Sequence, residues 1–137
     1  MKLTGRTILI TGASSGLGRS MALALSLRDN NLIITARREP LLRTLASAIE
    51  ANGSRCTVVA ADAIDPEATQ RVLDAGVAAY GRIDVAILNA GGATPMSMAD
   101  AASADVLHIM RLNYNTVVNF LSPLIAHMKA EGGVIGH

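Results

Sequence analysis

A glycine-rich segment near the N-terminus has the residue types that can bind a phosphate group. Residues 11–18 read Thr-Gly-Ala-Ser-Ser-Gly-Leu-Gly, after a strand-like run and before a helix-like one. There Gly12 allows a tight turn, Gly16 a close approach of backbone to ligand, and Gly18 close packing of helix on strand. The helix N-terminus adds free N–H groups and partial positive charge, and the two serines add hydroxyls. The segment predicts a pyrophosphate site; the alternative is a glycine-rich turn without a ligand.

Two arginines, Arg37 and Arg38, directly follow Thr35-Ala36 at the end of the second strand-like run. In a nucleotide-binding α/β fold an acidic residue here takes the ribose hydroxyls of NAD, whereas a nearby arginine accommodates the 2′-phosphate of NADP. Ala36 has no carboxylate to repel a phosphate. The guanidinium of Arg37 can make two charge-assisted hydrogen bonds to it, with Arg38 stacking on adenine or adding charge. The pair predicts NADP(H); the alternative is a solvated helix start.

Three further positions extend the pattern. Alone, Asp62 could be a turn former, Asn89-Ala90-Gly91 a strand-ending turn and Asn113 a polar residue on a helix. Together and in order, they and the glycine spacing resemble the short-chain dehydrogenases/reductases. That family has Thr-Gly-x-x-x-Gly-x-Gly, an aspartate after the third strand, Asn-Ala-Gly after the fourth and an asparagine in the fifth helix. The resemblance covers all 137 residues, although Leu88 departs from the frequent double asparagine.

The resemblance implies roles for these residues. It implies a catalytic role for Asn113 and hydride transfer between NADP(H) and a small carbonyl or alcohol substrate. The residues expected to bind the cofactor are Gly12, Ser14, Ser15, Gly16, Leu17, Gly18, Arg37, Arg38, Asp62, Ala63, Asn89, Ala90 and Gly91.

The family's catalytic Ser, Tyr and Lys are not found in this sequence. The lysines are Lys2 and Lys129, and the residue four before Lys129 is Ile125, so there is no Tyr-x-x-x-Lys pair. His137 directly follows the run 133–136 that is expected to form an incomplete fifth strand, just before the place of the family's serine. We therefore expect that the C-terminal portion of the domain is absent and that these residues are inactive alone. The alternative is a non-catalytic nucleotide-binding or scaffold protein.

Alternating strand-like and helix-like segments must position these residues. Apolar runs predict strands at 7–11, 32–36, 57–61, 84–89 and 133–136, each covered by helices on both faces. This order predicts a Rossmann-type α/β fold: a doubly wound parallel sheet in three α/β/α layers. We expect one NAD(P)-binding domain over residues 1–137, incomplete at its C-terminal end.

Helix signals lie between the strands. The apolar residues that share one face are Leu17, Met21, Ala24 and Leu25 in the first helix, and Leu41, Leu42, Leu45 and Ile49 in the second. Asn30 and Asn31 are expected to close the first helix, and Asp65 with Pro66 to begin the third. Residues 90–104 are the least periodic segment.

Residues 104–129 read as a helix that is apolar nearly all round. Such a helix is usually buried on two sides, and the resemblance implies that it pairs between subunits. We therefore expect a homo-oligomer, a dimer or tetramer; the alternative is burial within one monomer.

Composition narrows the class of protein. Of 137 residues, 50% are hydrophobic and 17% charged, which suits one domain with a substantial core, and a net charge of +1 favours neither nucleic acid nor a membrane surface. The sequence shows no signal peptide and no apolar run of ~18 residues, so we expect a cytoplasmic protein.

The single cysteine and the three histidines carry no signal of a metal site. Cys56 has no partner for a disulfide and is expected to be a buried, inert thiol. His108, His127 and His137 do not suggest a metal cluster and are expected to be solvated or to cap helices.

Overall fold

A five-stranded parallel sheet forms the centre of the computed structural model, which describes residues 2–93, 97 and 99–137. Its strands are β1 (Thr7–Thr11), β2 (Asn31–Ala36), β3 (Arg55–Ala60), β4 (Val85–Ile87) and β5 (Val134–Gly136). Their order is β3-β2-β1-β4-β5. The strand order therefore reverses between β1 and β4, and the carboxyl ends of these two strands flank the crevice where such sheets bind ligands.

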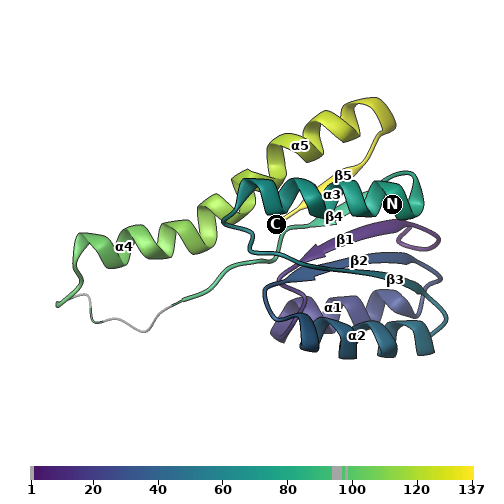
Figure 1. The fold of residues 1–137 in the computed structure, drawn as a ribbon, viewed down its shortest axis with the longest axis horizontal. Coiled ribbons are helices and arrows are strands. Elements are labelled where there is room, and N and C mark those ends of the chain that lie inside the picture. The colour runs from purple at the N-terminus through teal and green to yellow at the C-terminus, as the bar shows by residue number, and fades with distance from the viewer. Residues whose placement is uncertain (1, 94–96, 98) are drawn as a thin grey trace.

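Helices cover both faces of the sheet (Figure 1). α1 (Gly16–Ser26) and α2 (Glu39–Ala51) lie on one face, and α3 (Pro66–Tyr80) and α5 (Thr116–Glu131) on the other. Successive strand residues point to opposite faces, so Ile8 and Ile10 join the core on the α1 and α2 side, whereas Leu9 joins the core with Phe120 and Leu124. The predicted doubly wound, three-layer fold is confirmed.

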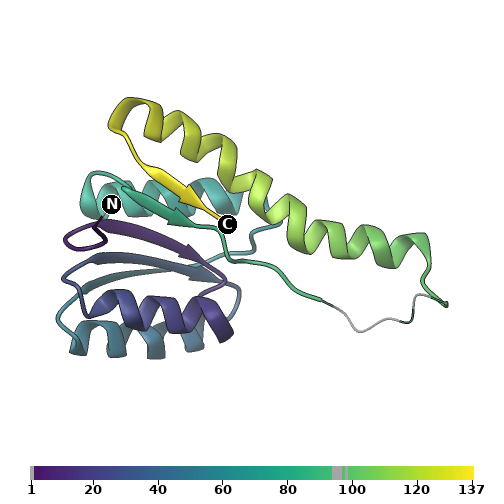
Figure 2. The same ribbon diagram turned by 180° about the vertical axis from the view of Figure 1, so that it is seen from behind.

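One continuous helical segment carries α4 (Ser103–Met110), the π-helical turn η1 (Arg111–Asn115) and α5. Its α4 end extends away from the sheet in both ribbon views (Figures 1 and 2). No residue of α4 or η1 is buried by the described part of the chain. The expected helix over 104–129 is therefore correct in extent, but its first half is not buried on two sides here. Positions 94–96 and 98 of the aperiodic segment 90–104 lie outside the described residues.

The first helix is rotated relative to our prediction. Its buried residues are Gly18, Ala22, Leu25 and Ser26, whereas Leu17 is 68% exposed and Ala24 is exposed. Gly18 fixes this rotation, because a Cβ there would lie 2.4 Å from the carbonyl oxygen of Gly12 and only glycine fits against the loop that follows β1. In α2 the prediction fails only at Leu41, which is exposed.

Strand lengths and helix ends also differ in part. β4 is shorter than the predicted 84–89, and β3 and β5 are only partly covered because they are the edge strands. α1 ends at Ser26 rather than at the asparagines, although the Asn30 amide donates to the carbonyl oxygen of Leu25 at 2.8 Å. Asn31 instead begins β2. The predicted start of α3 is confirmed, since Asp65 accepts the Glu67 N–H at 2.9 Å.

Candidate functional site

A cavity of about 260 Å³ lies where the carboxyl ends of the strands meet. Its walls come from the loops after β1 to β4 and from the start of the η1–α5 segment. The lining residues are Thr11, Gly12, Ser14, Ser15, Thr35, Ala36, Arg37, Arg38, Ala61, Asp62, Ala63, Ile64, Asn89, Ala90, Gly91, Leu112 and Thr116. Ten of the predicted cofactor residues are brought together here. Gly16, Leu17, Gly18 and Asn113 are not among these lining residues.

The glycine-rich loop takes the conformation that its sequence predicts. Gly12 has φ +66°, and a Cβ there would lie 2.9 Å from the Cα of Ala90. Gly16 has φ +55°, and its missing Cβ leaves open space among the described atoms. The loop therefore packs against the loop after β4 at one glycine and stays open at the next, at the start of α1.

The N-terminus of α1 is available to an anion. Within the described part of the chain, no side chain caps the helix at Ser15. The first N–H groups of a helix lack partners within it and carry partial positive charge. They can therefore donate to a phosphate, as the sequence predicts.

The two arginines after β2 have different surroundings. Arg38 donates from Nη2 to the hydroxyls of Ser14 (3.0 Å) and Ser15 (2.8 Å), so its guanidinium lies across the loop. Arg37 is exposed, and its guanidinium makes no hydrogen bond or ion pair with the described residues. The contact between Arg38 and the serines joins residues 23 and 24 positions apart, and the sequence alone does not show it.

Thr35, at the end of β2, is a lining residue that the sequence analysis missed. It is 3% exposed, and its Oγ1 has no hydrogen-bond partner among the described residues. A buried hydroxyl without a hydrogen-bond partner is unfavourable. This wall of the cavity therefore contains a polar group that has no partner among the described residues.

The loops after β1 and β4 are joined by hydrogen bonds. The Ala90 N–H donates to Thr11 Oγ1 at 2.9 Å, and the Asn89 amide donates to the Thr11 carbonyl oxygen at 3.4 Å. On the other side of this loop, Thr116 Oγ1 donates to the Ala90 carbonyl oxygen at 3.1 Å. The Asn89-Ala90-Gly91 segment is therefore a strand-ending turn and a wall of the cavity at once.

Asn113 holds the chain just beyond this turn. Its Oδ1 accepts the Gly92 N–H at 3.2 Å, and its Nδ2 donates to the carbonyl oxygens of Gly92 (2.7 Å) and Ile109 (2.9 Å). The residue lies in the π-helical turn η1, a distortion often found at functional sites. Asn113 therefore lies next to the turn that forms one wall of the cavity, although it does not line the cavity itself.

Asp62 forms a turn and lies at the cavity. Its Oδ1 accepts the Ile64 N–H at 3.1 Å, which makes it a turn former, and it also lines the cavity.

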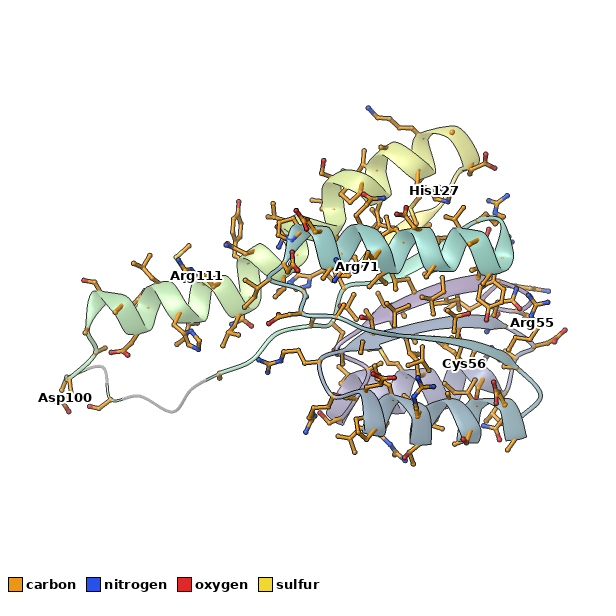
Figure 3. All side chains as sticks on the ribbon, in the orientation of Figure 1. Arg55, Cys56, Arg71, Asp100, Arg111 and His127 are labelled. Atoms are coloured by element: carbon orange, nitrogen blue, oxygen red, sulfur yellow. The ribbon has the colours of Figure 1, made fainter. Side chains whose placement is uncertain are left out.

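Cys56 and His127, both labelled in Figure 3, are not among the residues that line the cavity. Burial, with a smaller contribution from the charge of Glu50, raises the pKa of the half-buried Cys56 thiol to about 12, so it is unreactive. His127 on α5 is not simply solvated as expected: it is half-buried, and its Nε2 accepts the Ile83 N–H at 3.1 Å. Among the described residues, His, Cys, Asp and Glu side chains do not gather in any group of three or more that could hold a metal.

No helix within residues 2–93, 97 and 99–137 has the length and apolar character needed to cross a membrane.

Comparison with known proteins agrees with this geometry. The family model for short chain dehydrogenase matches residues 6–135. A γ-butyrolactone 1′-reductase of A-factor type (1S-forming) from Streptomyces virginiae is 37% identical over 133 residues, 95% of this chain and 51% of that protein. An 11-beta-hydroxysteroid dehydrogenase from Pinus massoniana is 30% identical over 97% of this chain and 38% of its own length.

Solved structures show the same fold. A short-chain type dehydrogenase/reductase from Mycobacterium marinum superposes with a TM-score of 0.91 at 29% identity, covering 98% of this chain and 55% of that one. L-Sorbose reductase from Gluconobacter frateurii, solved with NADPH and L-sorbose, superposes with a TM-score of 0.89 at 28% identity, covering 98% and 52%. The chain thus spans about half the length of most of these relatives. With a family match over nearly all its residues and a nucleotide-type loop at the strand ends, the chain belongs to the short-chain dehydrogenase family.

Proposed function

We propose that the protein is an oxidoreductase that transfers a hydride between NADP(H) and a carbonyl or alcohol group of a small molecule. The observation that carries the proposal is the composition of the cavity wall after β2. Arg37, Arg38 and Ser14 line the cavity there, and Ala36 contributes no carboxylate. Positive charge and hydroxyl donors gathered at one end of a nucleotide cavity favour an additional phosphate.

The residues of the cavity fit such a cofactor. The N–H groups at the start of α1 would hold the pyrophosphate, and Asp62 and Ala63 would lie beside the adenine. The unpartnered Thr35 hydroxyl supplies a polar group in the same wall. Asn89, Ala90 and Gly91 would border the nicotinamide end. NADP(H), when bound, supplies or accepts the hydride.

The names of similar proteins support the reaction class. The relative from Streptomyces virginiae is a reductase, and the sorbose reductase structure holds NADPH together with a sugar substrate. We assign Asn113 to the reacting end of the site, where it holds the loop at Gly92.

The preference between the two cofactors tests the proposal. In the complete protein, NADPH should bind about ten- to a hundredfold more tightly than NADH, because a hydrogen bond to a charged group contributes roughly 1.5–3 kcal/mol. Arg37→Ala should remove most of this preference and leave NADH binding little changed, whereas Ala36→Asp should invert it. Part of the attraction is exposed, so the preference should shrink as salt rises. Fluorescence titration measures both affinities.

Arg38→Ala is the matched control, because Arg38 already donates to Ser14 and Ser15. It should change the preference less than Arg37→Ala does. Equal affinities of the wild type for the two cofactors, or a full preference in Arg37→Ala, would contradict the assignment.

We also propose that the protein is a homo-oligomer. Exposed apolar side chains follow the helical segment from α4 to α5: Val106, Leu107, Met110, Tyr114, Val118 and Ile125. A patch of this kind on a soluble domain marks an interaction surface, and the sequence resemblance assigns the surface to a second subunit.

A further inference from the structure

Three polar side chains lie three residues apart along the η1–α5 segment, which is otherwise rich in apolar residues. They are Asn113, Thr116 and Asn119, and each donates to backbone carbonyl groups of loops at the carboxyl ends of the strands. Asn113 and Thr116 hold the loop after β4, at Gly92 and Ala90. Asn119 instead reaches the loop after β3. The helix thus connects the two loops that form opposite parts of the cavity.

Asn119 makes two hydrogen bonds to that second loop. Its Nδ2 donates to the carbonyl oxygens of Ala63 and Ile64, at 2.9 Å in each case. An amide nitrogen has two N–H donors, so both are used. Ala63 and Ile64 line the cavity, whereas Asn119 is half-buried and is not among its lining residues. Asn119 therefore binds the backbone of the cavity wall without lining the cavity itself.

The other hydrogen bonds of this loop do not fix its distance from α5. The Ala61 N–H donates to the carbonyl oxygen of Ala36 in β2, and the remaining two bonds, at Asp62, close the turn itself. These bonds hold the base and the shape of the loop. The Asn119 amide links the loop to α5.

We propose that Asn119 is a positioning residue for the adenine end of the bound cofactor, holding the Ala63–Ile64 backbone at the cavity wall through its two amide bonds. This inference rests on the proposed binding of NADP(H). It connects the adenine wall to the same helical segment that holds the reacting end at Asn113.

The test replaces the two donors by acceptors at constant size. In the complete protein, Asn119→Asp would place a carboxylate against two carbonyl oxygens, which repel it and displace the loop. Binding of adenosine 2′,5′-bisphosphate, measured by calorimetry at pH 8, should weaken about tenfold. Affinity should recover in part as the pH falls to 5, because a protonated carboxyl again donates to one carbonyl oxygen.

Matched variants separate positioning from general effects. Asn115→Asp makes the same chemical change on the same helical segment at an exposed residue whose side chain makes no hydrogen bond within the described structure. Its affinity should follow the wild type at every pH, which also corrects for titration of the ligand's phosphates. Asn119→Ala, which removes both donors without adding charge, should weaken binding without recovery at low pH.

The outcomes distinguish the inference from the proposed function. If the wild type does not bind adenosine 2′,5′-bisphosphate, the NADP(H) assignment itself fails. If the wild type binds it and both Asn119 variants bind equally well, or if Asn115→Asp shows the same loss and recovery as Asn119→Asp, the positioning role is overturned. Loss of the folded circular dichroism spectrum in both Asn119 variants would show that the residue holds the fold rather than the loop, and would overturn it too.

Discussion

Cys56 shows at the scale of one residue how burial controls reactivity. The thiol packs against the core formed with α2, and burial raises its pKa from 9.0 to about 12. The thiolate is the reactive form. A raised thiol pKa contributes stability at pH values below 9, and this contribution falls as pH rises from 9 towards 12.

We predict that iodoacetamide modifies Cys56 about a thousandfold more slowly in the native protein than in urea at pH 8. The reason is that the raised pKa of the buried thiol lowers its thiolate fraction at pH 8 by about that factor. Mass spectrometry of timed samples gives both rates, and Cys56→Ser provides the unlabelled control. Comparable rates in the two states would mean that the thiol is open to solvent.

Residues of the candidate site could be predicted from the sequence where the residue type itself determines what the residue can bind. The glycines and Arg37 are predicted in this way, whereas Asp62 is predicted only by the family resemblance, and the structure brings Gly12, Arg37 and Asp62 to one cavity. Thr35, Thr116 and Asn119 were not found, because a threonine or asparagine acquires its role from the backbone groups that the fold places beside it. The spacing of 113, 116 and 119 in an apolar helix was the available signal.

Asp84 ties two central strands together at the scale of the elements. It is 8% exposed, its Oδ2 accepts the Thr7 N–H at 2.9 Å, and its Oδ1 lies 2.7 Å from Arg82 Nε. Arg6 Nη1 is 3.9 Å from the same oxygen. The carboxylate thus joins the start of β1 to the start of β4.

We predict that Asp84→Ala lowers the free energy of unfolding by about 1–3 kcal/mol, because it leaves a buried N–H without an acceptor. Asp84→Asn should cost less, since its amide oxygen can still accept from Thr7. Asp74→Ala, at an exposed residue of α3, is the control and should lie within about 0.5 kcal/mol of the wild type. Urea unfolding measures all three, and an equal effect of Asp84→Ala and Asp74→Ala would contradict the assignment.

Elements were predictable where local chemistry determines them. The start of α3 follows from Asp65 and Pro66 alone, whereas the end of α1 depends on packing against neighbouring segments. The π-helical turn is defined by its backbone hydrogen bonds, which the pattern of side chains in the sequence does not indicate. Edge strands and central strands have similar sequences, because the burial of a strand depends on its neighbours in the sheet, and its own sequence does not identify them.

At the scale of the whole molecule, the missing Tyr-x-x-x-Lys pair leads to a prediction about activity. A polypeptide of residues 1–137 should bind NADPH weakly and oxidise none of it, because it holds the pyrophosphate loop but lacks the family's proton donor. Absorbance at the NADPH band with a panel of ketones measures this, with NADPH and ketone without the polypeptide as control. Ketone-dependent consumption of NADPH by the purified polypeptide would defeat the prediction.

The exposed apolar side chains of α4 predict an assembly of subunits. Light scattering of the complete protein at micromolar concentration should show a dimer or tetramer, and Leu107→Lys should shift it towards smaller species. Leu107 is 61% exposed on α4 and Leu27 is 70% exposed beside α1, so Leu27→Lys is the matched control and should leave the assembly intact. A wild-type monomer would count decisively against the oligomer.

The strand order has a consequence for the path of folding. Thr7 pairs with Asn31, 24 residues further on, but Ile8 pairs with Val85, 77 residues further on. Closing the longer loop costs about 1 kcal/mol more in chain entropy. We therefore expect β1, β2, α1 and α2 to assemble before β4 docks, so that the glycine loop forms first and the far wall of the cavity closes over it last.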